Sequence, residues 1–532
     1  MKTLPAALLL VSSFLVRAAD PTPVVEIEED VYTYTNANNG AGPMWCAGST
    51  CLVRSGDHVF ASGLETVADA KPLNNCRWTL FHRGPKGWDI VRVDAGRTRE
   101  PAPLTAFYDG RIFLSANPTL GSGPQPNGGP ARPEVLEFSA KTPGTLPVSL
   151  NPVWQGTPPF REHSYRSFAA DGAAGELVLF QNIDYTHAEW TFRDRTGKWS
   201  AQGKLKWPWG AEYDKPEPIR VCYPNVAVRD RAVHFVGVSD VIEPYETWRK
   251  FKRELTGQQW DYDFRRLFYT WTRDITKEPF AEWIEIASRD KTCGWVSPGD
   301  LWLAPNGDVH LLWTERALDE RLRAKFFPEA KQSHSLNYAV VHDGKVIRRH
   351  TLLESTEDRP GVTGSAGRFQ TTPDHRLFVV CYASGTETDG RSISENRMHR
   401  NSAGRRAGKA AAPALGKTLY ELLHDHRAGR FAAVADAGNA RIAGGQRQHD
   451  QLRPSAPVSI AGAEAVTLAA RLAKSNRRRA PATPVSGQPR ECGTAGSRGR
   501  CWPWTLPRKP KSRRSPNASR SSGKCGNSPG WC

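Results

Sequence analysis

Polar and apolar residues alternate in short runs over the first 390 positions, and the runs come in pairs separated by a turn. The clearest pair spans residues 297–313, with apolar residues at every second position on both sides of the turn Asn306-Gly307. Such a turn between alternating runs is a strong signal for a β-hairpin. Six hairpins are predicted, over residues 51–62, 104–115, 167–180, 225–238, 297–313 and 368–381.

A second pair of apolar runs follows most of these hairpins, as around Trp190 and Trp199 after the third. Two hairpins per repeat make a four-stranded antiparallel unit, and a period of about 45–75 residues is typical of propeller blades. We therefore predict an all-β fold, a six- or seven-bladed β-propeller whose last blade or blades are disrupted. A single long β-sandwich with irregular strands is the alternative.

The first 19 residues have the features of a secretory signal peptide. Lys2 provides the charged start, residues 4–16 form an apolar core, and small residues follow. That core is too short to span a bilayer, and no later run reaches the roughly 18 apolar residues that a membrane helix needs. We therefore expect a secreted or periplasmic protein with no membrane partner and a propeller domain at residues 24–390.

Residues 391–532 differ from the repeats in composition, being rich in Arg, Ala, Gly, Pro and Ser. They hold 27 of the 72 Lys and Arg residues but only 7 of the 55 Asp and Glu residues, which leaves 45 and 48 for the repeats. Because the repeats are nearly neutral, the net charge of +17 does not indicate a nucleic-acid partner for the folded domain.

Three interpretations of this basic tail remain open. It is a disordered segment that binds an anionic partner, a small separate helical domain, or a stretch translated out of frame. We favour the last, because the change of composition falls inside a repeat instead of between repeats.

The cysteines are compatible with disulfides in an exported protein. Cys222 and Cys293 precede the first strands of consecutive repeats, which makes them the favoured pair, although connectivity does not follow from a sequence. Cys381 lies inside an apolar run and is expected to be a buried thiol.

In a propeller, the loops that lead into each inner strand and the loops between the second and third strands gather on one face. Polar and aromatic residues concentrate in these loops, notably at residues 161–166, 220–225, 240–266 and 315–334. A concave face with convergent polar groups is where ligands bind. Residues 244–255 and 316–330 show helical spacing, and these helices either wall a cleft or pack against the rim.

His163 and Tyr223 precede inner strands of consecutive repeats, with Glu162 beside the first and Arg220 near the second. Histidine titrates near neutral pH, tyrosine passes a proton when a cation lowers its pKa, and arginine binds carboxylates bidentately. We therefore predict acid–base chemistry on an anionic sugar, with His163, Tyr223 and Glu162 as catalytic residues. Structural roles in loop hydrogen bonds are the alternative. The predicted substrate-binding residues are Arg166, Arg220, Arg368, Trp295, Asp184 and His187.

Carboxylates for a glycosidase pair also occur on this face, but the sequence does not give the separation that such a pair needs. No local metal-ligand spacing, phosphate loop, nucleophile elbow or dinucleotide motif occurs, so we expect neither a metal nor a cofactor. The carboxylates are Glu100, Glu162, Asp184, Asp240, Asp300 and Glu315.

Two degenerate Asp-box motifs, at residues 193–199 and 372–378, carry a resemblance to known proteins. Through them, residues 24–390 resemble the secreted sialidase-like (BNR-repeat) propellers. The resemblance implies a glycan-directed protein in which Arg166, Arg220 and Arg368 bind a carboxylate and Tyr223 is the nucleophile.

The related propeller polysaccharide lyases use His and Tyr as base and acid, with Arg on the carboxylate. His163, Tyr223 and Arg220 resemble that set equally well. We expect a monomer that hydrolyses or eliminates an acidic polysaccharide or glycan at the mouth of the central pore. A glycan-binding propeller without catalysis is the alternative, because one fold hosts many functions.

Overall fold

The computed structural model describes residues 23–400 except 44, 46–49, 69, 71–72, 122–127 and 373–375, together with the backbone of 433–436 and 439–442. The predicted signal peptide and most of the predicted tail lie outside the described residues. No helix in the described part of the chain is long and apolar enough to cross a membrane.

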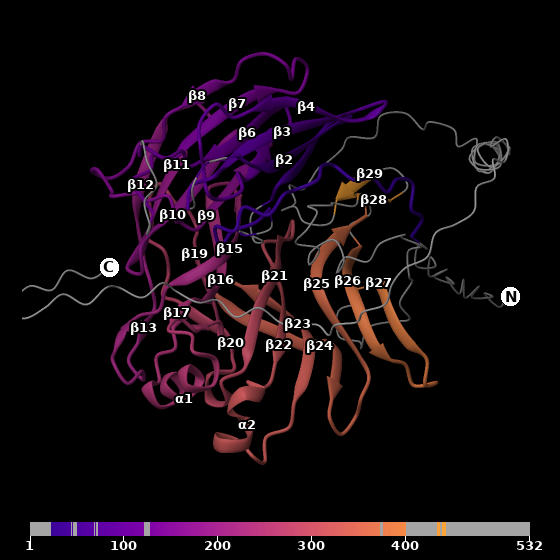
Figure 1. Ribbon diagram of the computed structural model, residues 1–532. Helices are drawn as coiled ribbons and strands as arrows, with labels where there is room; N and C mark the ends of the chain where they lie inside the picture. Colours follow the sequence, from indigo (N-terminus) through magenta and orange to yellow (C-terminus); the bar gives the residue numbers. More distant parts are fainter. Residues whose placement is uncertain are drawn as a thin grey trace, which may run out of the picture. The chain divides into compact units, whose positions relative to one another are not determined.

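The described residues form six larger antiparallel sheets that follow one another along the chain (Figure 1). The first contains β1 (Leu52–Ser55), β2 (His58–Thr66), β3 (Cys76–Gly84) and β4 (Gly87–Val93). The second contains β5 (Leu104–Ala106), β6 (Arg111–Ala116), β7 (Glu134–Ser139) and β8 (Val148–Leu150). The third contains β9 (Arg166–Asp171), β10 (Glu176–Ile183), β11 (His187–Arg193) and β12 (Trp199–Lys206).

The fourth sheet contains β15 (Val221–Arg229), β16 (Ala232–Ser239), β19 (Arg266–Thr272) and β20 (Ile284–Ser288). The fifth contains β21 (Trp295–Leu303), β22 (Val309–Arg316), β23 (Ser333–His342) and β24 (Lys345–Thr356). The sixth has three described strands, β25 (Val362–Thr371), β26 (Leu377–Thr386) and β27 (Ser392–Arg400).

All six predicted hairpins are present, as the pairs β1–β2, β5–β6, β9–β10, β15–β16, β21–β22 and β25–β26. In the fifth sheet the turn works as predicted, because Gly307 adopts a φ of 88° that favours glycine. The mostly-β, four-stranded antiparallel repeat is thus confirmed, and it is consistent with a propeller. The number of blades stays a prediction.

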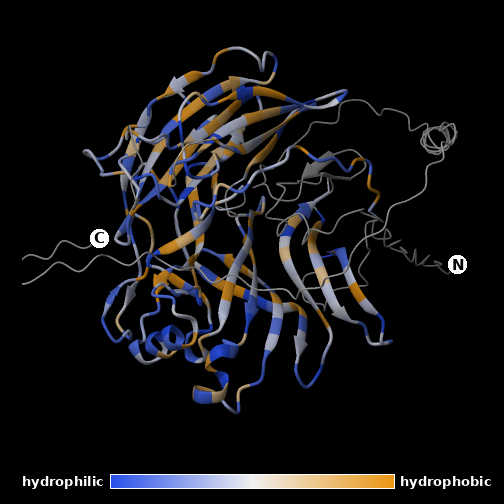
Figure 2. Cartoon of the chain, viewed as in Figure 1, coloured by the Kyte–Doolittle hydropathy of each residue, from blue (hydrophilic) through white to orange (hydrophobic). Residues whose placement is uncertain are grey.

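The core lies between consecutive sheets, with one apolar cluster for each successive pair. Strand alternation explains this, because successive residues point to opposite faces. Phe60 and Leu80 of the first sheet pack towards the second, whereas Ala61 and Phe81 pack on Val31 at the other face. Figure 2 shows the resulting mixture of hydrophobic and hydrophilic positions along the strands.

Regular pairing continues beyond residue 390, because β27 pairs with β26 over Ser392–Arg400. This strand falls in the stretch that we assigned to the tail. A short two-stranded ladder of β28 (Ala433–Asp436) and β29 (Asn439–Ile442) is also described by its backbone.

Both predicted helices are present, as α1 (Glu246–Thr256) and α2 (Glu320–Phe326). They contact each other through Phe251 and Phe326, whose ring centroids are 5.4 Å apart. The smaller elements near them are β13 (Trp209–Gly210) paired with β14 (Glu217–Pro218), β17 (Val241–Ile242) paired with β18 (Tyr262–Asp263), and the 3-10 helix η1 (Asp290–Thr292).

The favoured disulfide between Cys222 and Cys293 is not formed. Cys293 instead places its Sγ 3.0 Å from Arg265, while Cys222 packs against Tyr165. The prediction was wrong because similar positions in two repeats do not make their side chains converge. Cys381 is a buried thiol, as predicted.

Candidate functional site

Five aromatic side chains from four repeats form a continuous row, which we call the aromatic row. It runs through Trp45, Tyr165, Tyr223, Phe264 and Trp295. Successive ring centroids are 5.9, 5.0, 5.8 and 4.7 Å apart. Trp45 also touches Tyr223 directly, at 6.1 Å. These residues precede or begin inner strands or end the loop before β19, so the predicted face does bring residues of distant repeats together.

Tyr223 takes its place in this row through an irregularity in β15. The pairing with β16 shifts register between Cys222 and Asn225, which marks a β-bulge, and Tyr223 has a φ of 51°. A positive φ at a bulky residue is uncommon and costs conformational energy. Bulges of this kind redirect a side chain at the end of a strand, and here the redirected side chain is the predicted catalytic tyrosine.

His163 lies at the Trp45 end of the row, with its ring 6.2 Å from Trp45 and 6.1 Å from Tyr165. The side chain is exposed. Crowding by protein atoms, followed by the positive charges of Arg99 and Arg220, lowers the pKa of His163 below its ordinary value. His163 is therefore an accessible, neutral imidazole at neutral pH, which is the protonation state that a general base needs.

His163 and Tyr223 share two neighbours, because both pack against Trp45 and Tyr165. The hydroxyl groups of Tyr165 and Tyr223 are 3.4 Å apart. The predicted base and acid thus lie on one aromatic support, as their similar positions before consecutive inner strands suggested.

Arg220 is buried next to Tyr165, with its guanidinium 5.4 Å from the ring centroid, and it is held on several sides. Its guanidinium pairs with Asp240 at 3.0 Å and lies 3.8 Å from the ring centroid of Tyr185. The Tyr185 hydroxyl in turn lies 2.9 Å from that of Tyr262. A guanidinium stacked on tyrosines and tied to a carboxylate is a fixed positive charge, not a mobile one.

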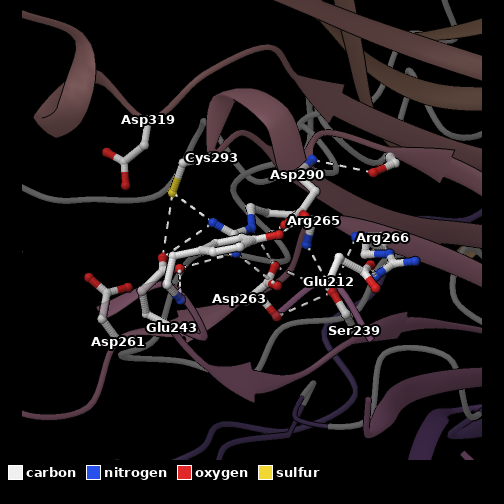
Figure 3. A network of polar contacts seen from close by, with 12 residues as sticks. Glu212, Ser239, Glu243, Asp261, Asp263, Arg265, Arg266, Asp290, Cys293 and Asp319 are labelled. Atoms are coloured by element: carbon white, nitrogen blue, oxygen red, sulfur yellow. Dashed lines mark hydrogen bonds and ion pairs between the residues drawn. The ribbon is translucent and has the colours of Figure 1, made fainter. Parts of the chain in front are cut away.

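The loop before β19 connects the aromatic row to a second, ionic environment. Tyr262 and Phe264 face the aromatic residues, since Phe264 touches Tyr223 and Trp295. Asp263 and Arg265 alternate with them and are buried in a network of polar contacts (Figure 3). This extended segment therefore presents aromatic rings on one side and charges on the other.

Arg265 is the centre of that network, which we call the Arg265 network. Its guanidinium contacts Asp263 at 2.8 Å, Glu243 at 3.2 Å, Asp290 at 3.2 Å and Cys293 at 3.0 Å. Burial raises the pKa of Asp263 to about 6, against the opposing effect of Arg265.

Lys252 extends the Arg265 network into the two helices. Its Nζ lies 2.6 Å from Glu243, 3.8 Å from Asp261 and 3.7 Å from Asp319, the N-cap of α2. Lys252 belongs to α1, so both helices are tied to the same buried charges. Whether the helices wall a cleft or pack against the rim stays a prediction.

Glu162, predicted as catalytic, is buried and accepts hydrogen bonds from the Thr119 hydroxyl and, at 2.8 Å, from the Gly129 N–H. Both carboxylate oxygens are therefore occupied by neighbouring loop residues. Its catalytic role stays a prediction that the contacts do not support.

The three predicted substrate-binding arginines have separate protein partners. Arg166 is buried and donates to the carbonyl of Pro101 at 2.6 Å. Arg368 is half-buried and donates to the carbonyl of Gly299 at 2.6 Å. With Arg220 paired to Asp240, each arginine already binds protein oxygen atoms.

Asp184 and His187 lie in the loop between β10 and β11. Asp184 is exposed and 3.7 Å from Arg161. His187 uses both ring nitrogens, one at 2.7 Å from Thr186 and one at 3.0 Å from Glu189. Neither residue has a contact with the aromatic row among those that the structure describes, and their substrate-binding roles stay predictions.

Three residues of the aromatic row were not among the predicted site residues. They are Trp45, Tyr165 and Phe264. Alternation within the loop at 262–265 was the available signal for Phe264. Trp45 and Tyr165 were visible only as aromatic residues just before predicted strands.

Comparison with known proteins gives no family. No protein-family model and no curated protein matches the chain. Solved structures similar to it include the GH93 α-L-arabinofuranosidase of Fusarium graminearum with arabinobiose (TM-score 0.29, 11% identity, covering 56% of this chain and 79% of that one). Another is the Penicillium chrysogenum α-L-arabinanase with arabinobiose (TM-score 0.30, 10% identity, covering 59% of this chain and 93% of that one). A third is the β-propeller domain of the Pyrococcus furiosus trilobed protease (TM-score 0.31, 10% identity, covering 68% of this chain and 97% of that one).

Proposed function

We propose that the protein cleaves an acidic polysaccharide by β-elimination at the aromatic row, with His163 as base and Tyr223 as acid. The observation that carries this proposal is the shared support of the two side chains. An accessible imidazole with a lowered pKa and a tyrosine both pack against Trp45 and Tyr165.

The reaction needs these two groups and no added reactant. Neutral His163 takes the proton from the carbon next to the uronate carboxylate, and the electron pair spreads onto the carboxylate as an enolate. This electron pair then forms a carbon–carbon double bond as the bond between the sugar carbon and the glycosidic oxygen breaks. That oxygen takes the proton of the Tyr223 hydroxyl, and the product chain carries an unsaturated uronate.

The fixed charges of Arg99 and Arg220 support this chemistry because they favour the negative charge that develops on the substrate. They also lower the pKa of His163, which keeps the imidazole unprotonated but makes it a weaker proton acceptor. Arg99 is held 5.1 Å from the Trp45 ring centroid and 3.1 Å from Glu100. Both arginines are thus oriented before substrate arrives, and preorganised charge is what stabilises a transition state.

Hydrolysis is supported less well, because the carboxylates of this face other than the exposed Asp184 are engaged by neighbouring protein groups. Glu100 is buried and accepts from Arg99 and from the Ser164 N–H at 2.9 Å, and Asp240 pairs with Arg220. A glycosidase pair needs one carboxyl group free to donate a proton and another free to attack or activate water. Glu162, Asp300 and Glu315 likewise accept hydrogen bonds from neighbouring protein groups.

The test uses the purified protein with polygalacturonate, alginate and hyaluronan, following near-ultraviolet absorbance from the new double bond. His163→Ala and Tyr223→Phe should each lower kcat by 10²-fold or more, the size of a lost acid–base catalyst. The matched controls are His342→Ala and Tyr108→Phe, both at exposed positions away from the aromatic row. Binding without turnover by the parent protein would show a glycan-binding protein and overturn the proposal.

A further inference from the structure

Three residues at the ends of neighbouring strands of the fifth sheet lie directly opposite one another. Trp295 in β21 pairs with Arg316 in β22, and Arg316 pairs with His334 in β23. Residues that pair across antiparallel strands project from the same face of the sheet. An indole, a guanidinium and an imidazole therefore stand side by side on this edge, and we call them the Trp295 platform.

The Trp295 ring is open to solvent, with 39% of the residue exposed, although it is a large apolar group. Phe264 packs against it at 4.7 Å, and the Arg316 guanidinium lies 5.8 Å from its centroid. A cation at this distance from an indole is favourably placed. The ring is thus held in position by protein and still has surface that a sugar ring can cover.

Arg316 brings a positive charge for which the described residues provide no ion-pair partner. Its Nε is buried without a hydrogen-bond partner among them. The neighbouring Glu315 is engaged elsewhere, since it pairs with Arg289 at 2.5 Å and accepts a hydrogen bond from the indole N–H of Trp313. An unsatisfied guanidinium beside an exposed indole has donors available for a carboxylate or sulfate.

The backbone under the platform is fixed. A Cβ on Gly294 would collide with the carbonyl oxygens of Arg316 and Ala317, the latter at 2.6 Å, so the chain passes very close to the end of β22. Cys293 before it is anchored on Arg265 of the Arg265 network. The platform therefore has a defined position before any ligand binds, which reduces the entropy lost on binding.

Phe264 links the platform to the proposed reaction centre, because its ring touches both Tyr223 and Trp295. Resting on the proposed function, we infer that the Trp295 platform binds an anionic sugar unit of the same chain that is cleaved at Tyr223. The substrate is then an acidic polymer held over several units and cut internally. A single terminal sugar would not reach the platform.

The test measures affinity against chain length, using galacturonate and hyaluronan oligosaccharides of two to ten units. Trp295→Ala and Arg316→Gln should each weaken binding of the longest oligosaccharides by about tenfold and leave disaccharides nearly unchanged. Methyl esterification of the galacturonate series should remove the effect of Arg316→Gln but not that of Trp295→Ala. Trp209→Ala and Arg273→Gln, at exposed positions, are the controls.

The inference fails if neither series binds, if binding does not depend on length, or if both variants weaken disaccharides as much as decasaccharides. Its failure is separable from that of the proposed function. Length-dependent binding through Trp295 and Arg316 without turnover would support the platform as a binding site and refute the proposed lyase activity. Turnover that is equally fast on short and long chains, with no effect of either variant, would support the lyase activity and refute the platform.

Discussion

Arg265→Met is the substitution whose effect follows most directly from the structure. It keeps an apolar stem of similar length but removes the guanidinium that contacts Asp263, Glu243, Asp290 and Cys293. Asp263 and Glu243 have no side-chain exposure, so water cannot replace the lost partner. Lys252 remains, but it reaches only Glu243 among these groups at ion-pair distance.

Removing one partner from a buried ion pair leaves an uncompensated charge and typically costs about 3–5 kcal/mol. We expect Arg265→Met to lower the free energy of unfolding by that amount, measured by urea unfolding with tryptophan fluorescence. Arg273→Met is the matched control, because its pair with Asp343 is 3.9 Å long and about two-thirds exposed. It should change stability by less than about 0.5 kcal/mol.

Asp263→Asn in the Arg265→Met background gives an internal check. It removes the stranded charge, so the double variant should be more stable than additivity of the two single variants predicts. A loss below about 1 kcal/mol for Arg265→Met, or strict additivity, would refute the idea that these charges are mutually dependent.

Three further predictions concern acid stability, backbone space and the reading frame. Burial lowers the pKa of His234 to about 3. The unfolded chain therefore takes up a proton at His234 below pH 6.5 while the folded chain does not, and the free energy of unfolding falls with pH. His234→Phe should make the loss of stability between pH 6.5 and 5 smaller by about 2 kcal/mol. Gly294→Ala should destabilise the fifth sheet by at least about 1 kcal/mol in urea, because the added Cβ would collide with two carbonyl oxygens. At Gly307 an added Cβ has free space, and the strain of an alanine there would come only from the φ of 88°. Resequencing of codons 385–410 should reveal an insertion or deletion if the tail is out of frame, and an unchanged reading frame would refute that interpretation.

The hairpins followed from the sequence because their signals are local. Turn residues such as Asn306 and Gly307 and alternating apolar positions act within about a dozen residues, and the pairing of β21 with β22 depends on little else. The neighbourhood of His163 and Tyr223 was predicted from their similar places before consecutive inner strands. The β-bulge that turns Tyr223 into the aromatic row was not, because a bulge leaves no local signal in this sequence.

The Arg265 network was not predictable, because it depends on which side chains of one long insertion and a following turn become buried together. Nothing in the spacing of Glu243, Lys252, Asp263, Arg265 and Cys293 indicates a common cluster. The same dependence on three-dimensional packing explains why a disulfide was expected at Cys293, where the thiol contacts a guanidinium instead.

Product mass is the measurement that tests the central claim most directly. The purified protein is incubated with polygalacturonate, alginate or hyaluronan, and the released oligosaccharides are weighed by mass spectrometry beside those of His163→Ala. Elimination at His163 and Tyr223 predicts products that are one water lighter than hydrolysis products, formed by the parent protein and absent with the variant. Products of full hydrolysis mass, or light products that the variant makes equally fast, would contradict it.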